Sequence, residues 1–357
     1  MEESKPILAA VVIQCIYAGY FLLTKLAFDV GMDTFVFVFY RQAAATLFLA
    51  PIAIFFERKT APRLSFSTFI KIFVLSLFGI TMSLDVVGIG LKYTSASLGA
   101  ATSNTLPVIT FFLAVLFRME KVKIRTSPGM MKMTGVTLCM GGVAIIAFYR
   151  GPLFQLWHHH PLSLQSHNYN YIPPTNTWIK GVFLLLLSQI TWSSWLVLQG
   201  RVLKIYPSKL VLTTVQCCMS TIQSFVTAVV FARDPAQWRL GLNLRLVSVA
   251  YCGVVVTGVT FYMQAWVIEK KGPVFLAMTT PLIMLITLII STFFLGETIT
   301  LGSVLGGVVL VGGLYFVLWG KTKEEERANL DVEKVCAAET KGDGEKKACQ
   351  QSKAQLQ

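Results

Sequence analysis

The sequence predicts an all-α integral membrane protein with ten transmembrane helices, built from two inverted repeats of five helices each. Ten apolar stretches fill residues 6–320, and each is close to the roughly 20 helical residues that cross a bilayer. The second five stretches repeat polar and helix-bending residues of the first five in the same order. The 357-residue chain is 54% hydrophobic and only 14% charged, with a mean hydropathy of +0.63. This composition favours lipid over water as the solvent of the folded chain.

The expected spans follow directly from the apolar stretches. They are residues 7–28, 35–56, 69–91, 97–117, 130–149, 179–198, 210–232, 246–268, 273–295 and 301–319. A large soluble core explains them less well, because buried helices of soluble proteins are usually shorter. The first stretch is longer than the apolar part of a signal peptide and lacks a clear cleavage site, so we expect the chain to retain it.

The positive charge of the chain points to a membrane surface rather than to nucleic acid. The formal charge of +13 arises from 31 Lys and Arg residues against 18 Asp and Glu. Before the final tail, most cations lie in alternate loops, such as the loop with Arg118, Lys121 and Lys123, whereas the intervening loops hold few. By the positive-inside rule this pattern places both termini in the cytosol. We therefore expect membrane lipid, and no nucleic acid, as a partner.

Two segments outside the spans complete the domain organisation. The expected units are a first five-helix repeat at 1–150, an extracellular or lumenal loop at 151–178, a second repeat at 179–320 and a cytosolic tail at 321–357. The tail is rich in Lys, Glu, Gln and Ala, which predicts disorder. The loop carries His158, His159, His160 and His167. Adjacent His residues without Cys or carboxylate companions make a poor metal cage, so we predict neither a metal nor a cofactor.

An internal repeat is the strongest organising signal in the chain. Gln14 and Tyr17 in the first span align with Gln189 and Trp192 in the sixth, at an offset of 175 residues. The offset continues where Gln42 meets Gln216 and where Pro107 meets Pro281, both at 174, and where Gly141 meets Gly312, at 171. Because each half has an odd number of spans, the halves should have opposite orientations in the membrane. Inverted repeats of this kind usually hold a substrate between the halves, near the middle of the bilayer.

Local sequence motifs resemble a known family. The matching segments are Phe37 to Gln42, Tyr93 to Ala96, Leu106 to Phe111, Trp195 to Gln199, Tyr206 to Pro207, Arg233 to Asp234, Gly272 to Phe275, Leu295 to Glu297 and Gly313 to Lys321. They resemble the plant nodulin-21-like, or walls-are-thin-related, transporters. These belong to the EamA-like group of the drug/metabolite transporter superfamily and are often described as usually-multiple-acids-move-in-and-out transporters. The resemblance covers residues 5–325.

The resemblance implies a plant plasma-membrane carrier of amino acids that works by facilitated, bidirectional transport with net export. The vacuolar membrane is the alternative location, and some relatives handle auxin or specialised metabolites instead. The sequence departs from the family pattern in the third span, where Asp85 replaces the expected uncharged Gln or Asn.

Two charged residues inside the predicted spans require partners, because a charge at mid-bilayer costs about 2.5–3.5 kcal/mol on insertion scales. Arg41 and Asp85 lie at similar distances from the outer ends of their spans, so we predict a structural ion pair or gate between them. Two alternatives remain open: Arg41 receives a substrate carboxylate, or Asp85 exchanges protons. If Arg41 keeps Asp85 ionised, we expect facilitated diffusion with weak or no proton coupling.

Polar and aromatic residues at mid-span predict the substrate site. A small organic acid needs hydrogen-bond partners for its ends and an apolar or aromatic wall for its body. On the first and sixth spans we predict binding by Gln14, Tyr17, Gln189 and Trp192, and on the fourth and ninth by Asn104, Thr105, Thr279 and Thr280. Pro107 and Pro281 follow the last two pairs and are predicted hinges, because proline frees a backbone carbonyl and bends a helix. The competing interpretation is helix packing, since such side chains often bond across membrane helices.

Other functional classes fit the sequence less well. There is no Gly-x-Ser-x-Gly, His-Glu-x-x-His or phosphate-binding Gly-Lys-Ser/Thr motif and no paired carboxylate in a span, so we predict neither an enzyme with catalytic residues nor an ATP-driven pump. A polytopic receptor is the alternative from a different class. A sugar-phosphate or nucleotide-sugar carrier should have more basic residues inside its spans than Arg41 and Lys25.

Overall fold

The computed structural model describes residues 4–57, 64–94, 96–117, 119, 126–149, 153–154, 175–241, 243–290 and 299–339. The first half of the chain forms α1 (Ser4–Asp29), α2 (Thr34–Glu57), α3 (Phe66–Leu75), the π-helix η1 (Ser76–Thr81), α4 (Met82–Tyr93), α5 (Ala96–Thr102), the 3-10 turn η2 (Ser103–Thr105), α6 (Leu106–Leu116) and α7 (Ser127–Phe148). These elements follow one another in the order of the predicted spans.

The second half begins after the short strand β1 (Leu153–Phe154). It forms α8 (Thr175–Ile205), α9 (Lys209–Phe231), the 3-10 turn η3 (Pro235–Trp238), α10 (Leu244–Ala250), the π-helix η4 (Tyr251–Val259), α11 (Thr260–Lys271), α12 (Pro273–Met278), α13 (Pro281–Ile290), strand β2 (Ile299–Thr300) and α14 (Leu301–Glu339). The antiparallel pairing of β1 with β2 is a small departure from the all-α prediction, and it joins the end of α7 to the start of α14.

The chain is a multi-pass, helical membrane protein. In the described part, eight helical segments are long and apolar enough to cross a membrane, and they match eight of the predicted spans. The predicted fifth span forms α7 but is not among these eight. In the predicted ninth span, the apolar helical stretch Pro273–Thr287 is shorter, and residues 291–295 lie outside the described part.

Short turns connect the helices where the sequence supplies the required residues. The Asp33 carboxylate accepts hydrogen bonds from the backbone N–H groups of Phe35 and Val36, at 2.9 and 3.3 Å. It therefore satisfies donors that the first turn of α2 leaves free. Gly272 separates α11 from α12 with φ = +84°, a backbone conformation that favours glycine.

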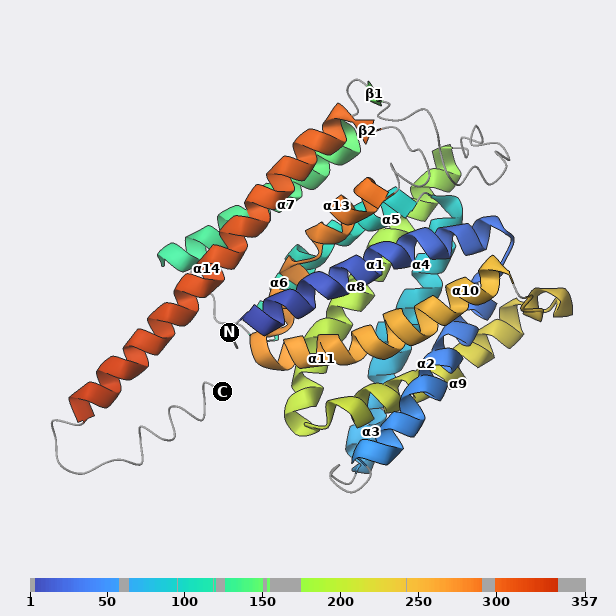
Figure 1. Cartoon of the computed structure of the whole chain (residues 1–357), viewed down its shortest axis with the longest axis horizontal. Helices are drawn as coiled ribbons and strands as arrows, with labels where there is room; N and C mark the ends of the chain where they lie inside the picture. The colour runs from blue at the N-terminus through green and yellow to red at the C-terminus, as the bar shows by residue number, and fades with distance from the viewer. Residues whose placement is uncertain are drawn as a thin grey trace.

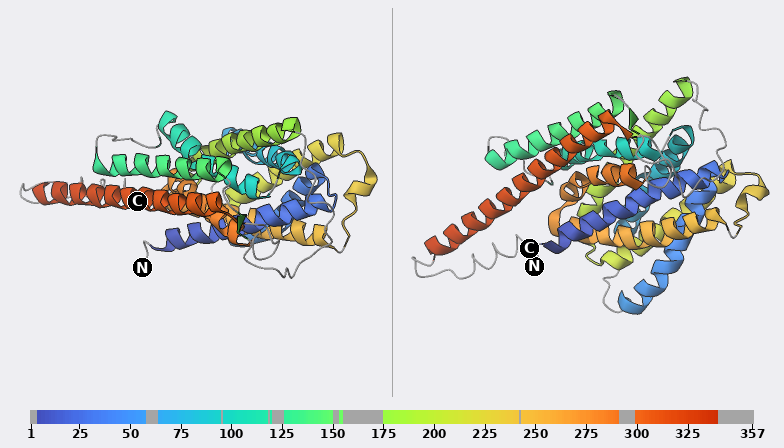
Figure 2. Two further views of the ribbon diagram at one scale, coloured as in Figure 1. Left: turned by 90° about the horizontal axis from the view of Figure 1, so that it is seen from above. Right: turned by 45° about the horizontal axis from the view of Figure 1, so that its top comes forward.

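The helices form a central bundle with one helix pair at its side. In Figures 1 and 2, α7 and α14 lie side by side along the flank of the bundle that contains the remaining helices. Gly135 and Gly313 meet at their backbones in this pair: a Cβ atom at Gly135 would lie 2.6 Å from the Gly313 carbonyl oxygen. Small residues thus allow the close contact of two helices in an apolar environment.

The prediction of a disordered tail from residue 321 is wrong for residues 321–339, which continue α14 as helix. The same Lys, Glu, Arg and Ala residues that argued against a packed core are good helix formers. Lys132 of α7 pairs with Glu324, and Lys323 pairs with Glu326 one turn further along α14, so charge pairs support this extension. Residues 340–357 and the histidine loop at 158–167 lie outside the described residues.

The two halves repeat each other's irregularities. The π-helix η1 begins at Ser76 and η4 begins at Tyr251, 175 residues later, which is the offset found in the sequence. η1 packs on α9 and η4 packs on α2, so each π-helix contacts the second long helix of the other half. Between α2 and α9, the Thr46 and Thr221 hydroxyls, also 175 residues apart, lie 2.9 Å from each other. Equivalent residues therefore meet where the halves join.

Candidate binding cavity

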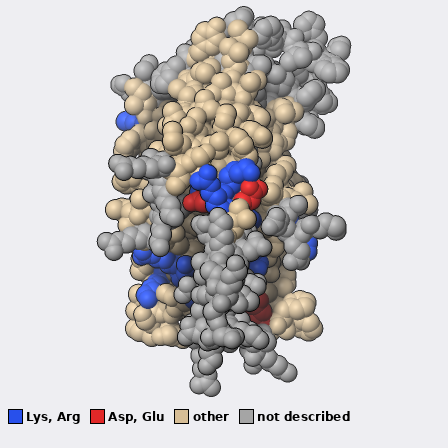
Figure 3. Space-filling view, turned by 90° about the vertical axis from the view of Figure 1, so that its left-hand side faces the viewer, with Lys and Arg blue, Asp and Glu red and all other residues tan. Residues whose placement is uncertain are grey.

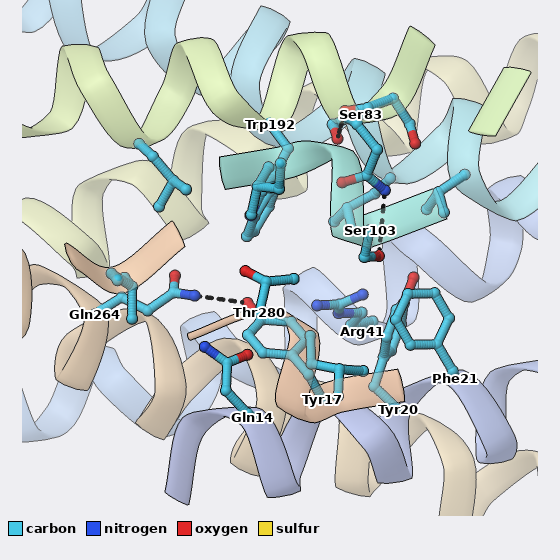
Figure 4. A pocket seen from close by; sticks show the side chains of 18 residues that line it. Gln14, Tyr17, Tyr20, Phe21, Arg41, Ser83, Ser103, Trp192, Gln264 and Thr280 are labelled. Carbon is cyan, nitrogen blue, oxygen red and sulfur yellow. Dashed lines mark hydrogen bonds between the residues drawn. The ribbon is translucent and has the colours of Figure 1, made fainter. Parts of the chain in front are cut away.

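A cavity opens at the centre of the bundle, between elements of both halves (Figure 4). It encloses about 630 Å³ of empty space, its open mouth and the adjoining solvent included. Its walls are Gln14, Tyr17, Tyr20 and Phe21 of α1, Arg41 of α2, Ser83, Leu84 and Val87 of α4, Ser103 of η2, Leu106 of α6, Ser188, Gln189, Trp192 and Leu196 of α8, Gln264 of α11, Leu276 of α12, Thr280 before α13 and Ile283 of α13.

The two repeat-related glutamines both line the cavity. Gln14 donates through Nε2 to the Thr279 hydroxyl at 2.6 Å, and Gln189 donates through Nε2 to the Ser103 hydroxyl at 3.4 Å. Each acceptor lies at the irregular point of a helix from the other half, Thr279 after α12 and Ser103 in η2. Each glutamine therefore links an unbroken helix of one half to a broken helix of the other.

An aromatic wall lies beside these amides. Tyr17 and Trp192 line the cavity with their ring centroids 6.3 Å apart in an edge-to-face arrangement. Behind Trp192, the Trp195 and Phe261 rings complete an aromatic cluster. Gln264 Nε2 donates to the Tyr17 hydroxyl at 3.1 Å (Figure 4), which fixes the tilt of that ring. The cavity thus offers a flat apolar surface next to polar groups.

The predicted residues on the fourth and ninth spans lie at the helix breaks, but only Thr280 lines the cavity. Asn104 is fully buried, and its Nδ2 contacts the Met284 sulfur at 3.1 Å. Thr105 donates to the Thr102 carbonyl within its own turn. Thr279 lies behind Gln14 as its hydrogen-bond acceptor.

The predicted hinge prolines begin the helices that follow these breaks. Pro107 is in the first turn of α6, and Pro281 is the first residue of α13. Proline suits such positions because its missing N–H has no intrahelical partner there. The breaks at η2 and at Thr279 and Thr280 are therefore where we expect these two helices to bend.

The predicted Arg41–Asp85 ion pair is not formed in this structure, where none of the ion pairs within the described residues joins the two. Arg41 points to η4 and α1 instead: its Nε donates to the Thr257 hydroxyl at 2.7 Å, and its guanidinium carbon lies 4.8 Å from the centre of the Tyr20 ring. Asp85 does not line the cavity, and its Oδ1 is buried without a hydrogen-bond partner among the described residues. The sequence places Arg41 and Asp85 at a similar depth on two helices, but it does not show that their side chains point to different neighbours.

Sequence reasoning missed several cavity residues, of which Tyr20 and Gln264 are the most informative. Tyr20 lies three residues after Tyr17, so both share one face of α1. Gln264 is an amide inside an apolar span, the same signal that identified Gln14. Ser83, Ser103 and Ser188 gave no such signal, because small hydroxyl residues are common at the packing faces of membrane helices.

The fold and the cavity define a class of protein. A cavity at the centre of a multi-pass membrane protein, between two halves with matching helix irregularities, is the arrangement of secondary transporters. The model of the EamA-like transporter family matches the chain twice, at residues 4–148 and 179–319. The chain belongs to this family and contains two EamA domains, as the resemblance of its motifs indicated; it is a membrane transporter, not an enzyme.

Curated relatives narrow the family further. The chain is 56% identical to WAT1-related protein At5g64700 of Arabidopsis thaliana over 337 residues, covering 93% of this chain and 94% of that protein. It is 46% identical to WAT1-related protein At1g43650 of the same plant over 326 residues, covering 91% and 94%. A solved crystal structure matches with a TM-score of 0.60 over 89% of this chain and 97% of its own length. At 13% identity, that match shows the fold alone.

Proposed function

We propose that the chain carries amino acids across the membrane by facilitated, bidirectional alternating access, with net export in the cell. The observation that carries this proposal is the cavity itself, which combines the cation Arg41, the amides of Gln14, Gln189 and Gln264 and the rings of Tyr17 and Trp192. A free amino acid presents a carboxylate, an amine and a side chain of variable polarity. Charged, amide and aromatic groups together provide partners for all three.

The proposal includes ten spans with both termini in the cytosol, made of repeats at residues 1–150 and 179–320. It assigns α7 and the segment from Pro273 to the two further spans, which gives five per half and opposite orientations. Figure 3 views the left-hand side of Figure 1, toward which α14 runs, and Lys and Arg appear there in several places. By the positive-inside rule, these cations support a cytosolic location for that side of the molecule. We place the carrier in the plasma membrane, with the vacuolar membrane as the alternative.

Facilitated transport is supported by the chemistry of the cavity walls. Its described lining residues include one cation, Arg41, and no Asp or Glu. A proton-driven carrier generally needs an ionisable group that binds and releases a proton near the substrate. An ion pair between Arg41 and Asp85 would also have favoured weak proton coupling, but this structure does not form it. The lining residues support the same conclusion independently of that pair.

Transport of auxin or another small organic acid is the second candidate. The Tyr17 and Trp192 rings favour it, because an edge-to-face aromatic pair suits a planar ring system. By contrast, a sugar-phosphate or nucleotide-sugar carrier is disfavoured, since a single cation lines the described cavity.

A flux screen in oocytes tests the proposal. Cells that express the protein are loaded with labelled amino acids or labelled indole-3-acetate, and efflux is measured with and without unlabelled substrate outside. We expect amino acid efflux that external substrate accelerates, as a bidirectional carrier requires. Val87→Trp, which fills the cavity wall, should abolish the flux, whereas Phe112→Trp at a lipid-exposed position should not. Surface-expressed protein with no amino acid flux would contradict the proposal, and flux of indole-3-acetate alone would favour the second candidate.

A further inference from the structure

We propose that Arg41 is the carboxylate anchor of the cavity, so that the carrier selects substrates with a free carboxylate over their neutral amides. This inference rests on the proposed function and adds the chemical group by which the substrate is recognised. It also replaces the structural ion pair predicted from the sequence.

Arg41 is a buried cation without an anionic partner in the described structure. Its side chain is 1% exposed, and among the described residues no Asp or Glu oxygen lies within 4.0 Å of it. A charge removed from water is costly unless an opposite charge compensates it. A bound carboxylate would supply this compensation, so the cavity is favourable for an anion.

The Arg41 guanidinium keeps N–H donors that can bind a substrate. An arginine side chain has five N–H donors. One is used by the Nε bond to Thr257 at 2.7 Å, and the guanidinium carbon lies 4.8 Å from the centre of the Tyr20 ring. Arg41 lines the cavity, and its two terminal nitrogens are not among the polar atoms that are buried without a partner. Since the Thr257 bond uses Nε, these nitrogens are the ones that can face the cavity. Donors that remain at the cavity wall match the two oxygens of a carboxylate.

The surrounding helices hold Arg41 from two sides. Thr257, which receives the Nε bond, belongs to η4, and Gly253 of the same π-helix packs on the Arg41 backbone. A Cβ atom at Gly253 would lie 2.8 Å from the Arg41 carbonyl oxygen, so only glycine permits this approach. The Tyr20 ring covers the guanidinium at 4.8 Å from the α1 side. The cation is therefore positioned before a substrate arrives.

The rest of the cavity fits one carboxylate better than a more highly charged group. Arg41 is the single cation among its described lining residues, and much of the wall is aromatic or aliphatic. Gln264 enters the cavity on the opposite side of Tyr17 from Arg41 in Figure 4, and its Oε1 is a buried acceptor without a partner among the described residues. An amine at the other end of the substrate would find an acceptor there.

Pairs of acids and amides test the anchor. Efflux from oocytes is measured for phenylalanine and phenylalaninamide and for indole-3-acetate and indole-3-acetamide, with surface protein quantified for every variant. We expect the wild type to prefer the transported acid over its amide by about tenfold, the difference between charge-assisted and neutral hydrogen bonds. Arg41→Gln should remove this preference while retaining flux of the amide, and Arg41→Lys should keep part of it. Lys92→Gln removes a cation outside the cavity and should leave the preference unchanged.

The outcomes separate this inference from the proposed function. Equal transport of acid and amide by the wild type, or a preference that survives in Arg41→Gln, would overturn the anchor and leave the carrier function intact. Absence of flux for all four compounds in surface-expressed wild type would overturn both. If Arg41→Gln does not reach the surface, thermal stability of the purified wild type provides the readout: the acid should raise the melting temperature more than its amide, and equal shifts would contradict the anchor.

Discussion

The two repeats share a backbone plan but differ in the polar groups that occupy it. In the first half, Thr81 of η1 contacts α9 through the neutral side chains of Ser220 and Gln223, at 2.8 and 2.9 Å. In the second half, Thr257 of η4 contacts α2 through the cation Arg41, at 2.7 Å. The scaffold is therefore repeated while the charge is not. A repeated scaffold allows the halves to exchange conformations, and a charge on one side gives the substrate a fixed orientation.

A second difference concerns the glutamines that link unbroken to broken helices. The bond from Gln14 to Thr279 is 2.6 Å long, whereas the bond from Gln189 is 3.4 Å long and reaches Ser103, two residues before Thr105, the position that the repeat matches to Thr279. If alternating access interchanges the conformations of the repeats, the contact of Gln14 with the break between α12 and α13 should lengthen, and the contact of Gln189 with η2 should shorten. The present structure then has its tight contact between α1 and the α12–α13 break, and its loose contact between α8 and η2.

The largest effect is expected where η4 meets α2. In Gly253→Ala, the new Cβ would lie 2.6 Å from the Ala44 Cβ and 2.8 Å from the Arg41 carbonyl oxygen, so the helices must separate. We expect a loss of stability of about 1–3 kcal/mol, typical of overpacking, measured as a lower melting temperature of the detergent-solubilised protein. Gly312→Ala is the control, because a Cβ atom added there would meet no neighbouring atom of the described chain within 4 Å. Equal melting temperatures for both variants would show that the η4 contact is not tight.

The next effect is on transport and compares the two glutamines. Gln14→Leu removes the bond of 2.6 Å and leaves the buried Thr279 hydroxyl without that donor. Gln189→Leu removes the longer, weaker bond of 3.4 Å. Hydrogen bonds between membrane helices contribute about 0.6–1.7 kcal/mol, so Gln14→Leu should reduce amino acid flux by about three- to fifteenfold. Gln189→Leu should reduce it less.

Surface expression of both glutamine variants should stay near that of the wild type. If Gln14→Leu instead lowers expression and leaves the flux per molecule unchanged, Gln14 serves packing rather than the cavity. Equal losses of flux would contradict the difference in bond length as a guide to function.

The differences between the halves also show how much the sequence could predict. Span order and the repeat were readable because they depend on apolar length and on polar residues recurring at a fixed offset, as with Gln14 and Gln189. The cavity was predicted in part: glutamine and aromatic residues in apolar spans are conspicuous. The direction of the Arg41 side chain was not readable, because it depends on helix rotation and on the π-helical geometry of η4, which places Thr257 at its Nε.

The tail shows a different limit. Residues 321–339 contain the charged, alanine-rich composition typical of both disordered segments and exposed helices. What separates the two outcomes is a neighbour: Lys132, far away in the sequence, pairs with Glu324. Composition alone does not report a contact between the first and the second half.

A smaller effect is expected from the threonines of the π-helices. Thr257→Val removes the acceptor that orients Arg41, whereas Thr81→Val removes a contact between neutral groups. We expect Thr257→Val to lower the preference for a carboxylate substrate over its amide by about threefold, near the mean contribution of such bonds. Thr81→Val should leave the preference unchanged. Thr257→Ser keeps the hydroxyl and should behave like the wild type, and a loss in all three variants would indicate a general packing defect.

The smallest expected effect concerns protons and asks whether Asp85 belongs to the transport machinery. Asp85 lies on α4 outside the cavity lining and apart from Arg41, with the Thr227 hydroxyl as a polar neighbour. Because no acidic residue lines the described cavity, flux should follow the substrate gradient in either direction. It should change little between acidic and neutral external pH or on addition of a protonophore.

Asp85→Asn should retain flux within about twofold of the wild type, since an amide occupies nearly the same volume as the carboxyl group and Asp85 does not line the cavity. It should impair the carrier less than Arg41→Ala, which removes the cation of the cavity. The measurement is uptake and efflux of a labelled amino acid at both pH values, with surface protein as the control. Uphill accumulation at acidic pH that disappears with the protonophore or in Asp85→Asn would make Asp85 a proton carrier. Transport would then depend on Asp85 of the first half in addition to Arg41, which is the single charged residue among the described lining residues of the cavity.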